Sequence, residues 1–350
     1  MNSIIQKNKL KTGIVFDPVF LKHNQVGHPE NAKRLDAIVT GLKESELIEK
    51  LIQVKSREAV VEEILYCHTE EYVEHLKEFC EAGGGYLDPD TYSNQYSFDA
   101  ASTVVGSSID LTKAVINGEL NNGFALLRPP GHHALSNKSM GFCLLGNISI
   151  AAKAALNKQG IERVAIVDFD VHHGNGTQAL IGDDPNILFI STHQYPFYPG
   201  TGSLREIGRG EAEGSLINIP LEAGVGDTGF IRIYEEIVLP ALRKFNPDLI
   251  LVSAGYDAHW DDPLANLNLS LTGYNWISRE LIKLANEFCS GKIIFFLEGG
   301  YNLDVLRYGV TNAIRGLMGI DSFEDPFGQS KIPEPDNKKL ITELRQIHKL

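Results

Sequence analysis

Seven short apolar runs recur along the chain and constrain its fold more than any other feature. They are rich in β-branched and aromatic residues, and most are continuous rather than alternating with polar residues. Continuous runs are typical of strands that are covered on both faces, as in parallel sheets. The runs lie at residues 12–17, 123–128, 163–170, 186–192, 215–220, 248–257 and 292–300.

Stretches with helical spacing connect several of these runs, at residues 143–158, 227–245 and 273–290. Parallel strands need such crossover helices, so the sequence predicts an α/β fold with a mainly parallel central sheet flanked by helices. A chain of 350 residues can bury a large core, and it shows no internal repeat or long linker. We expect one domain over residues 1–350, with a charged C-terminal extension from about 322 to 350 that lies on the surface and ends in a helix.

Charge and composition exclude several functional classes. The 32 Lys and Arg residues against 45 Asp and Glu give a net charge of −13, and no basic patch is visible, so we expect no direct binding of nucleic acid. No apolar stretch approaches the ~18 residues of a membrane span, and the first residues do not resemble a signal peptide. The four cysteines are scattered, which favours reduced thiols. We therefore expect a soluble, cytoplasmic protein without a membrane partner.

Polar side chains cluster where the predicted strands end, which is where ligands bind in open parallel sheets. At the end of the run at 163–170, strand alternation makes Asp168, Asp170 and His172 point the same way. Asp257 ends the run at 248–257 and can bring a second carboxylate to the same rim. Two carboxylates and one imidazole leave a metal position open, as in catalytic zinc sites. The alternative is that these residues only cap turns.

Two further clusters supply groups for proton transfer. His132 and His133 follow the strand at 123–128, and Tyr301 follows a glycine pair after the strand at 292–300. A histidine pair can provide a base and an acid near neutral pH, and a tyrosyl hydroxyl can donate to a developing oxyanion. Together with a metal, these groups predict a metal-assisted amide hydrolase.

The motifs, taken in order, resemble those of the zinc-dependent histone deacetylases, whose superfamily also includes acetylpolyamine amidohydrolases and arginases. The resemblance covers nearly the whole chain and implies their three-layer arginase/deacetylase-like α/β fold. The matching segments are His28–Glu30 through Arg34, RPPGHHA (128–134), GFC (141–143), DFDVHHGNGT (168–177), PGTG (199–202), SAGYDAH (253–259) and LEGGYN (297–302).

The resemblance implies roles for the clustered residues. It assigns one zinc ion per chain, with Fe²⁺ as the alternative ion, to Asp170, His172 and Asp257. It makes His132, His133 and Tyr301 catalytic, and it leaves open which histidine is the acid and which the base. Asp168 lies behind His132. The position behind His133 is Asn175, where class I enzymes have a carboxylate, and this resembles class II and bacterial members.

The same resemblance implies a tunnel for an extended acetylated chain. Gly141, Phe142 and Tyr198 match its walls, with Tyr198 in place of the usual phenylalanine. Leu264 completes the apolar wall, and Arg34 matches a residue of an inner acetate channel.

The rim and a second ion are also assigned by resemblance. Asp88 is expected to hold the substrate backbone, with Asp90 as a competing alignment, and Gly300 is expected among the substrate-binding residues. The family also implies monovalent-cation sites, with K⁺ as the expected structural ion. The nearer site would use backbone carbonyls together with two hydroxyl-bearing residues: Asp168, Asp170, His172, Ser191 and Thr192.

The expected function is hydrolysis of the acetamide of N-acetyl-lysine in proteins or peptides, and the alternative is an acetylpolyamine amidohydrolase. An arginase-like dinuclear site would need a carboxylate two residues after His172, where the chain has Gly174. A reader that only binds acetylated ligands would be expected to have lost a metal ligand or Tyr301, and none is lost. The oligomeric state stays open.

Overall fold

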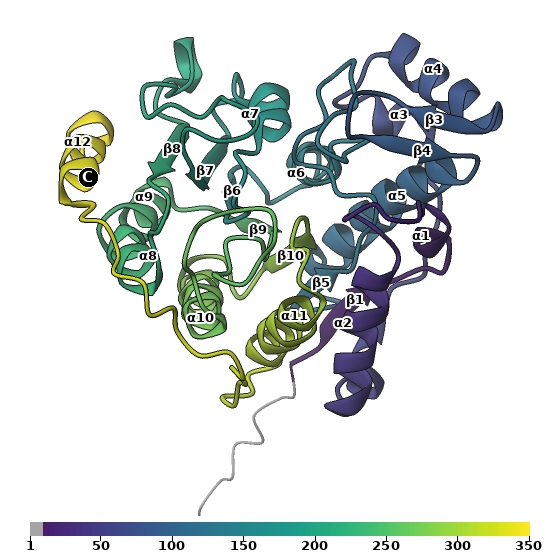
Figure 1. The fold of residues 1–350 in the computed structure, drawn as a ribbon. Coiled ribbons are helices and arrows are strands. Elements are labelled where there is room, and N and C mark those ends of the chain that lie inside the picture. The colour runs from purple at the N-terminus through teal and green to yellow at the C-terminus, as the bar shows by residue number, and fades with distance from the viewer. Residues whose placement is uncertain (1–9) are drawn as a thin grey trace, which may run out of the picture.

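The computed structural model describes residues 10–350 and contains a three-layer α/β domain (Figure 1). Its central sheet has eight strands in the order β2-β1-β5-β10-β9-β6-β7-β8, and every neighbouring pair is parallel. The strands are β1 (Thr12–Val15), β2 (Ile52–Gln53), β5 (Asn122–Ala125), β6 (Val164–Asp168), β7 (Ile187–Gln194), β8 (Leu216–Leu221), β9 (Leu249–Ala254) and β10 (Ile293–Leu297).

Helices cover both faces of the sheet (Figure 1). One face carries α2 (Lys33–Glu44), α8 (Asp227–Ile233), α9 (Leu239–Phe245), α10 (Leu271–Phe288) and α11 (Leu303–Leu317). The other carries α5 (Ser97–Ile116), α6 (Asn147–Leu156) and α7 (Asn175–Ile181). The core strands β6, β9 and β10 are buried along their whole length. Because both faces are covered, their sequences are continuously apolar.

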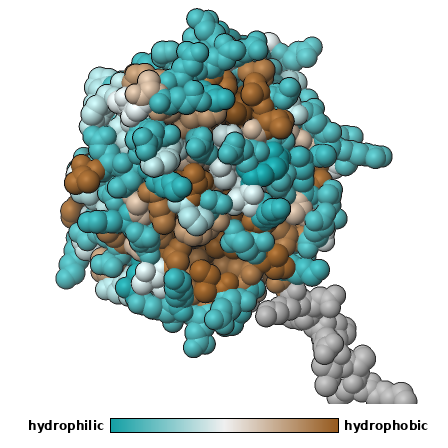
Figure 2. Space-filling model, turned by 90° about the vertical axis from the view of Figure 1, so that its right-hand side faces the viewer, coloured by the Kyte–Doolittle hydropathy of each residue, from teal (hydrophilic) through white to brown (hydrophobic). Residues whose placement is uncertain are grey.

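The remaining elements are short or peripheral. They are α1 (Val19–Lys22), η1 (Ile48–Lys50), α3 (Val61–Ile64), α4 (Glu70–Glu81), η2 (Gly210–Ala212), the π-helical turn η3 (Tyr234–Val238), α12 (Lys338–His348) and an antiparallel hairpin of β3 (Gly84–Tyr86) and β4 (Tyr92–Asn94). Figure 2 shows the face that carries α4 and β3, where hydrophilic residues predominate and hydrophobic ones gather toward the lower edge.

All seven predicted strands and the three predicted helical connections are present, so the α/β prediction is confirmed. The edge strand β2 and the β3–β4 hairpin are additional to it. Strand β2 has two residues, both exposed, so it has no apolar run that could mark it. Within residues 10–350, no helix combines the length and apolar character needed to cross a membrane. The cytoplasmic location and the absence of nucleic-acid binding stay predictions.

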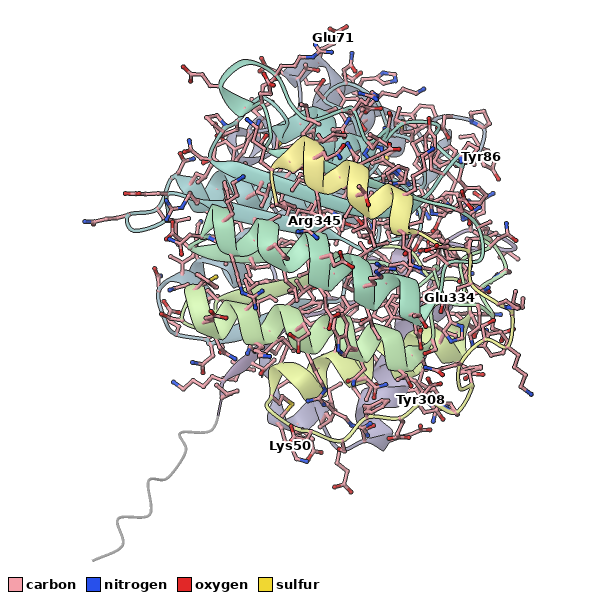
Figure 3. All side chains as sticks on the ribbon, turned by 90° about the vertical axis from the view of Figure 1, so that its left-hand side faces the viewer. Lys50, Glu71, Tyr86, Tyr308, Glu334 and Arg345 are labelled. Atoms are coloured by element: carbon pink, nitrogen blue, oxygen red, sulfur yellow. The ribbon has the colours of Figure 1, made fainter. Side chains whose placement is uncertain are left out.

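The C-terminal segment is more than a surface extension. It ends in a helix as expected, but α12 packs with Ile341 and Leu344 in the core. Ahead of the helix, the Glu334 carboxylate accepts the backbone N–H groups of Thr228 and Gly229 at the start of α8, at 3.0 and 2.7 Å. Figure 3 shows α12 lying over the outside of the molecule, with Glu334 at the segment leading into it. The apolar residues of α12 lie on one face of the helix, so the helix packs against the core although most of its residues are charged or polar.

We expect Leu344→Ala to lower the free energy of unfolding by about 2–5 kcal/mol, because it removes a fully buried leucine side chain and leaves a cavity. Urea unfolding followed by circular dichroism would measure the change. Gln346→Ala, at an exposed position of the same helix, is the control and should change stability by less than about 0.5 kcal/mol. Equal, small effects of the two substitutions would show that α12 is not part of the cooperative unit.

Candidate active site

Three potential metal ligands converge beyond the carboxyl ends of the neighbouring strands β6 and β9. Asp170 and His172 follow β6, and Asp257 follows β9. One ligand atom from each side chain lies within 4.8 Å of the others. The Nδ1 atom of His172 is 3.1 Å from Asp170 Oδ1 and 3.3 Å from Asp257 Oδ2. The parallel pairing of these strands therefore assembles the predicted ligand set.

The local chemistry fits a bound cation. Asp257 Oδ2 is buried and, apart from the 3.3 Å approach of His172 Nδ1, has no hydrogen-bond partner among residues 10–350, so a bound cation would offset the cost of burying this carboxylate. Gly299 faces the same point, since a Cβ atom there would overlap both Asp257 Oδ2 and Asp170 Oδ2. Only a glycine lets the segment after β10 approach these carboxylates so closely. The backbone N–H of Gly299 donates to Asp170 Oδ2 at 2.8 Å.

The two predicted histidines lie side by side above this cluster, with ring centroids 4.0 Å apart. His132 Nδ1 is 3.1 Å from Asp168 Oδ2, and His133 Nδ1 is 2.7 Å from Asn175 Oδ1. Each imidazole thus has one nitrogen held by a side-chain oxygen, which fixes the ring and leaves Nε2 for other partners. Asp168 and Asn175 occupy the positions behind the pair that the sequence indicated.

The two histidines differ in their electrostatics. Burial opposes the charged form of His132, but attraction to Asp170 and Asp168 outweighs it and raises the pKa to about 10. Burial lowers the pKa of His133 well below its usual value, and repulsion from His132 and His172 adds to this shift. A cation bound at Asp170 would oppose the positive charge on His132.

Tyr301 follows β10 and lines the same cavity as the histidine pair. Its backbone N–H donates to Asp262 Oδ2 at 2.7 Å, and the Arg34 guanidinium lies 5.2 Å from its ring centroid. Burial raises the pKa of the hydroxyl well above its usual value, and the Asp257 carboxylate adds to the shift. The hydroxyl therefore stays protonated and can donate a hydrogen bond.

Sequence reasoning missed two carboxylates that hold the site in place. Glu298 is buried, and its Oε2 accepts the backbone N–H groups of Gly131 and His132 at 2.8 and 3.2 Å. It thereby ties β10 to the turn that carries the histidines. Asp262 similarly fixes the backbone of Tyr301. Glu298 lies inside a quoted motif, but nothing in its spacing indicates which backbone groups it reaches.

A cavity of about 230 Å³ leads to these residues. Its lining includes the predicted wall residues Gly141, Phe142, Tyr198 and Leu264, and also Phe197, whose ring stacks on His172 at 5.4 Å. The other lining residues are Asp90, Pro130, His132, His133, His172, Gly299 and Tyr301.

Three residues of the predicted substrate set lie outside this lining. Asp88 Oδ1 accepts the backbone N–H groups of Asp90 and Thr91 at 3.1 and 2.7 Å, so it stabilises the turn while Asp90 faces the cavity. Arg34 is fully buried behind the cavity and donates to the Gly300 carbonyl at 2.7 Å. Asp90 therefore lines the cavity, whereas Asp88, Arg34 and Gly300 do not, and the substrate-binding roles of these residues stay predictions.

The residues of the predicted monovalent-cation site come from the end of β6, the segment that follows it, and β7, with Asp168 paired to Ser191. Thr192 Oγ1 donates to the Asp168 carbonyl at 3.4 Å, and the Ser191 hydroxyl lies 2.9 Å from His193 Nδ1. The K⁺ site stays a prediction.

Comparison with known proteins places the chain in a family. Residues 28–317 match the histone deacetylase domain. The chain is 42% identical to Histone deacetylase 14, chloroplastic, of Arabidopsis thaliana over 94% of this chain and 82% of that protein. It is 42% identical to a Probable deacetylase of Archaeoglobus fulgidus over 93% and 89% of the two chains.

A solved structure shows the same fold. The crystal structure of the HDA15 HD domain superposes with a TM-score of 0.88 at 35% identity, covering 97% of this chain and 94% of that one. The matched domain spans most of the chain, including every residue of the metal cluster and the histidine pair. The chain belongs to the histone deacetylase family of hydrolases, which act on amide bonds.

Proposed function

We propose that the protein is a zinc-dependent deacetylase that hydrolyses the acetamide of N-acetyl-lysine in proteins or peptides. The observation that carries this proposal is the convergence of Asp170, His172 and Asp257 at a cavity that also receives the histidine pair and Tyr301. An apolar-walled cavity of about 230 Å³ suits a neutral aliphatic chain that ends in an acetamide.

Each group in the site has a separate role in the proposed reaction. When bound by the three ligands, zinc would supply Lewis-acid polarisation of the acetamide carbonyl and lower the pKa of water. The Tyr301 hydroxyl donates to the carbonyl oxygen as negative charge develops there. His132 Nε2 accepts the proton of the attacking water, while Asp168 holds its Nδ1–H. The resulting imidazolium returns a proton to the leaving lysine nitrogen, and acetate departs.

Substrate class is tested by a paired rate measurement on purified, zinc-loaded protein. We expect kcat/KM for an N-acetyl-lysine peptide to exceed that for an N-acetylated polyamine, and a chelator to abolish both activities. The reverse preference would move the assignment to a small-molecule amidohydrolase. Reloading the metal-free protein with Fe²⁺ in place of Zn²⁺ tests which ion supports the higher rate.

Asp90 is proposed as the rim group that accepts N–H donors of the substrate. It lines the cavity, and its Oδ1 accepts the Thr91 hydroxyl at 3.2 Å. We expect Asp90→Asn to raise KM for the peptide about fivefold, because an amide oxygen accepts a weaker hydrogen bond than a carboxylate does, while kcat changes by less than about twofold.

Asp88→Asn is the matched control, since an amide oxygen can still accept the two backbone N–H groups of this turn. KM should therefore stay within about twofold of the wild-type value in this variant. A larger KM effect of Asp88→Asn than of Asp90→Asn would restore Asp88 as the rim residue.

A further inference from the structure

Phe142 forms one wall of the cavity in an unfavourable backbone conformation. Met140 and Cys143 exchange backbone hydrogen bonds of 3.2 and 3.0 Å around the two-residue turn Gly141–Phe142. Both turn residues have positive φ, 56° for Gly141 and 67° for Phe142. Glycine adopts this region freely, but a phenylalanine is strained there and needs neighbours that hold it.

Thr91 is one of these neighbours. It is fully buried in the loop between β3 and β4, and its Oγ1 accepts the backbone N–H of Phe142 at 3.0 Å. The same hydroxyl donates to Asp90 Oδ1 at 3.2 Å. The Thr91 hydroxyl therefore links Phe142 to Asp90. Asp90 is the one acidic residue among the described residues that line the cavity.

His28 supports the same arrangement from the other side. Its Nε2 lies 2.9 Å from the Asp90 carbonyl oxygen, and its Nδ1 lies 3.1 Å from the Glu30 backbone nitrogen and 3.0 Å from the Glu30 carbonyl oxygen. Its ring also meets the Phe142 ring edge-on, with centroids 4.7 Å apart. The ring contacts do not restrain the Phe142 backbone N–H, so that restraint depends on Thr91.

We propose that Thr91 is a positioning residue, whose hydroxyl holds the Phe142 wall and the Asp90 carboxylate in one arrangement and thereby sets substrate affinity. This inference rests on the proposed deacetylase function. Thr91 does not line the cavity, so the hydrolytic step itself should be insensitive to it.

The test compares Thr91→Val, which removes the hydroxyl at nearly constant volume, with Thr91→Ser, which keeps it. In full-length zinc-loaded protein, we expect Thr91→Val to raise KM for an N-acetyl-lysine peptide about fivefold or more, with kcat within about twofold. Thr91→Ser should restore KM to within about twofold of wild type. Thr112→Val removes another buried hydroxyl, on α5, and should leave KM unchanged.

Hydrogen exchange at the Phe142 amide gives a readout that is independent of activity. Loss of its acceptor should make exchange at this amide at least about fivefold faster in Thr91→Val than in wild type or Thr91→Ser. An unchanged exchange rate, or an equal rise in KM in both Thr91 variants, would overturn the proposal.

A double substitution tests the link to the rim. If Thr91 acts partly through Asp90, Thr91→Val should raise KM by a smaller factor in the Asp90→Asn background than in wild type. Equal factors would contradict the link. Failure of the wild-type protein to hydrolyse any N-acetyl-lysine peptide would instead contradict the proposed function, and the exchange measurement would still decide whether Thr91 holds Phe142.

Discussion

Tyr301→Phe is expected to lower kcat for an N-acetyl-lysine peptide by about 10²–10³-fold, the usual effect of removing one oxyanion donor. The substitution removes only the hydroxyl, because phenylalanine keeps the ring contacts with Phe142 and Arg34. Burial and the Asp257 carboxylate raise the pKa of the hydroxyl, so it is a donor throughout the neutral range. The change should fall mainly on kcat, since the donor acts on charge that develops during the reaction.

Steady-state kinetics with metal content measured in the same samples would check this result. Tyr308→Phe is the matched control, because Tyr308 lies on α11 at the outside of the molecule (Figure 3) and should leave kcat within about twofold. A Tyr301→Phe enzyme with full metal content and wild-type kcat would remove Tyr301 from the mechanism.

Glu30→Gln should lower the free energy of unfolding by about 3–5 kcal/mol, because it leaves two buried guanidinium groups without their negative partner. Glu30, Arg34 and Arg128 are all fully buried. Arg128 Nη2 donates to Glu30 Oε2 at 2.7 Å, its Nε pairs with Oε1, and Arg34 Nη1 donates to Oε1 at 3.1 Å. A neutral amide cannot replace this charge.

Urea unfolding with linear extrapolation would measure the loss. The control Glu49→Gln, at an exposed position, should shift stability by less than about 0.5 kcal/mol. If both substitutions gave the same small shift, the buried network would contribute nothing to stability beyond that of an exposed carboxylate.

The same network predicts a pH dependence. Burial alone would raise the pKa of Glu30, but Arg128 and Arg34 outweigh it and lower the pKa from 4.5 to about 2. A carboxyl with a lowered pKa in the folded state stabilises the fold above the unfolded-state pKa and loses this contribution as the pH falls. Wild type should therefore lose more stability than Glu30→Gln between about pH 4.5 and 2, measured by urea unfolding at each pH. Parallel curves would contradict the assigned shift.

The parts of the fold that the sequence predicts are those with a local signal. Strands such as β6 and β9 are continuous apolar runs, and the residues directly after them share one edge because the strands are parallel. Asp170, His172 and Asp257 could therefore be brought together without knowing any loop.

The parts that escape prediction depend on contacts between distant segments. Glu30 meets Arg128 across 98 residues, and Asp262 meets the Tyr301 backbone across 39. Whether Asp88 or Asp90 is available to a substrate depends on which carboxylate accepts the backbone N–H groups of the turn, and in the structure Asp88 does so. The packing of α12 was hidden because a charged composition obscures the two apolar residues that reach the core.

The most direct test of the central claim is a metal titration of the metal-free protein, with zinc content and hydrolysis of an N-acetyl-lysine peptide measured in the same samples. We expect activity to rise in proportion to zinc and to level off at one ion per chain, and Asp257→Ala to bind less zinc and to hydrolyse correspondingly less peptide. Activity that is independent of zinc content, or an Asp257→Ala variant with full activity, would contradict a metal-dependent deacetylase at this site.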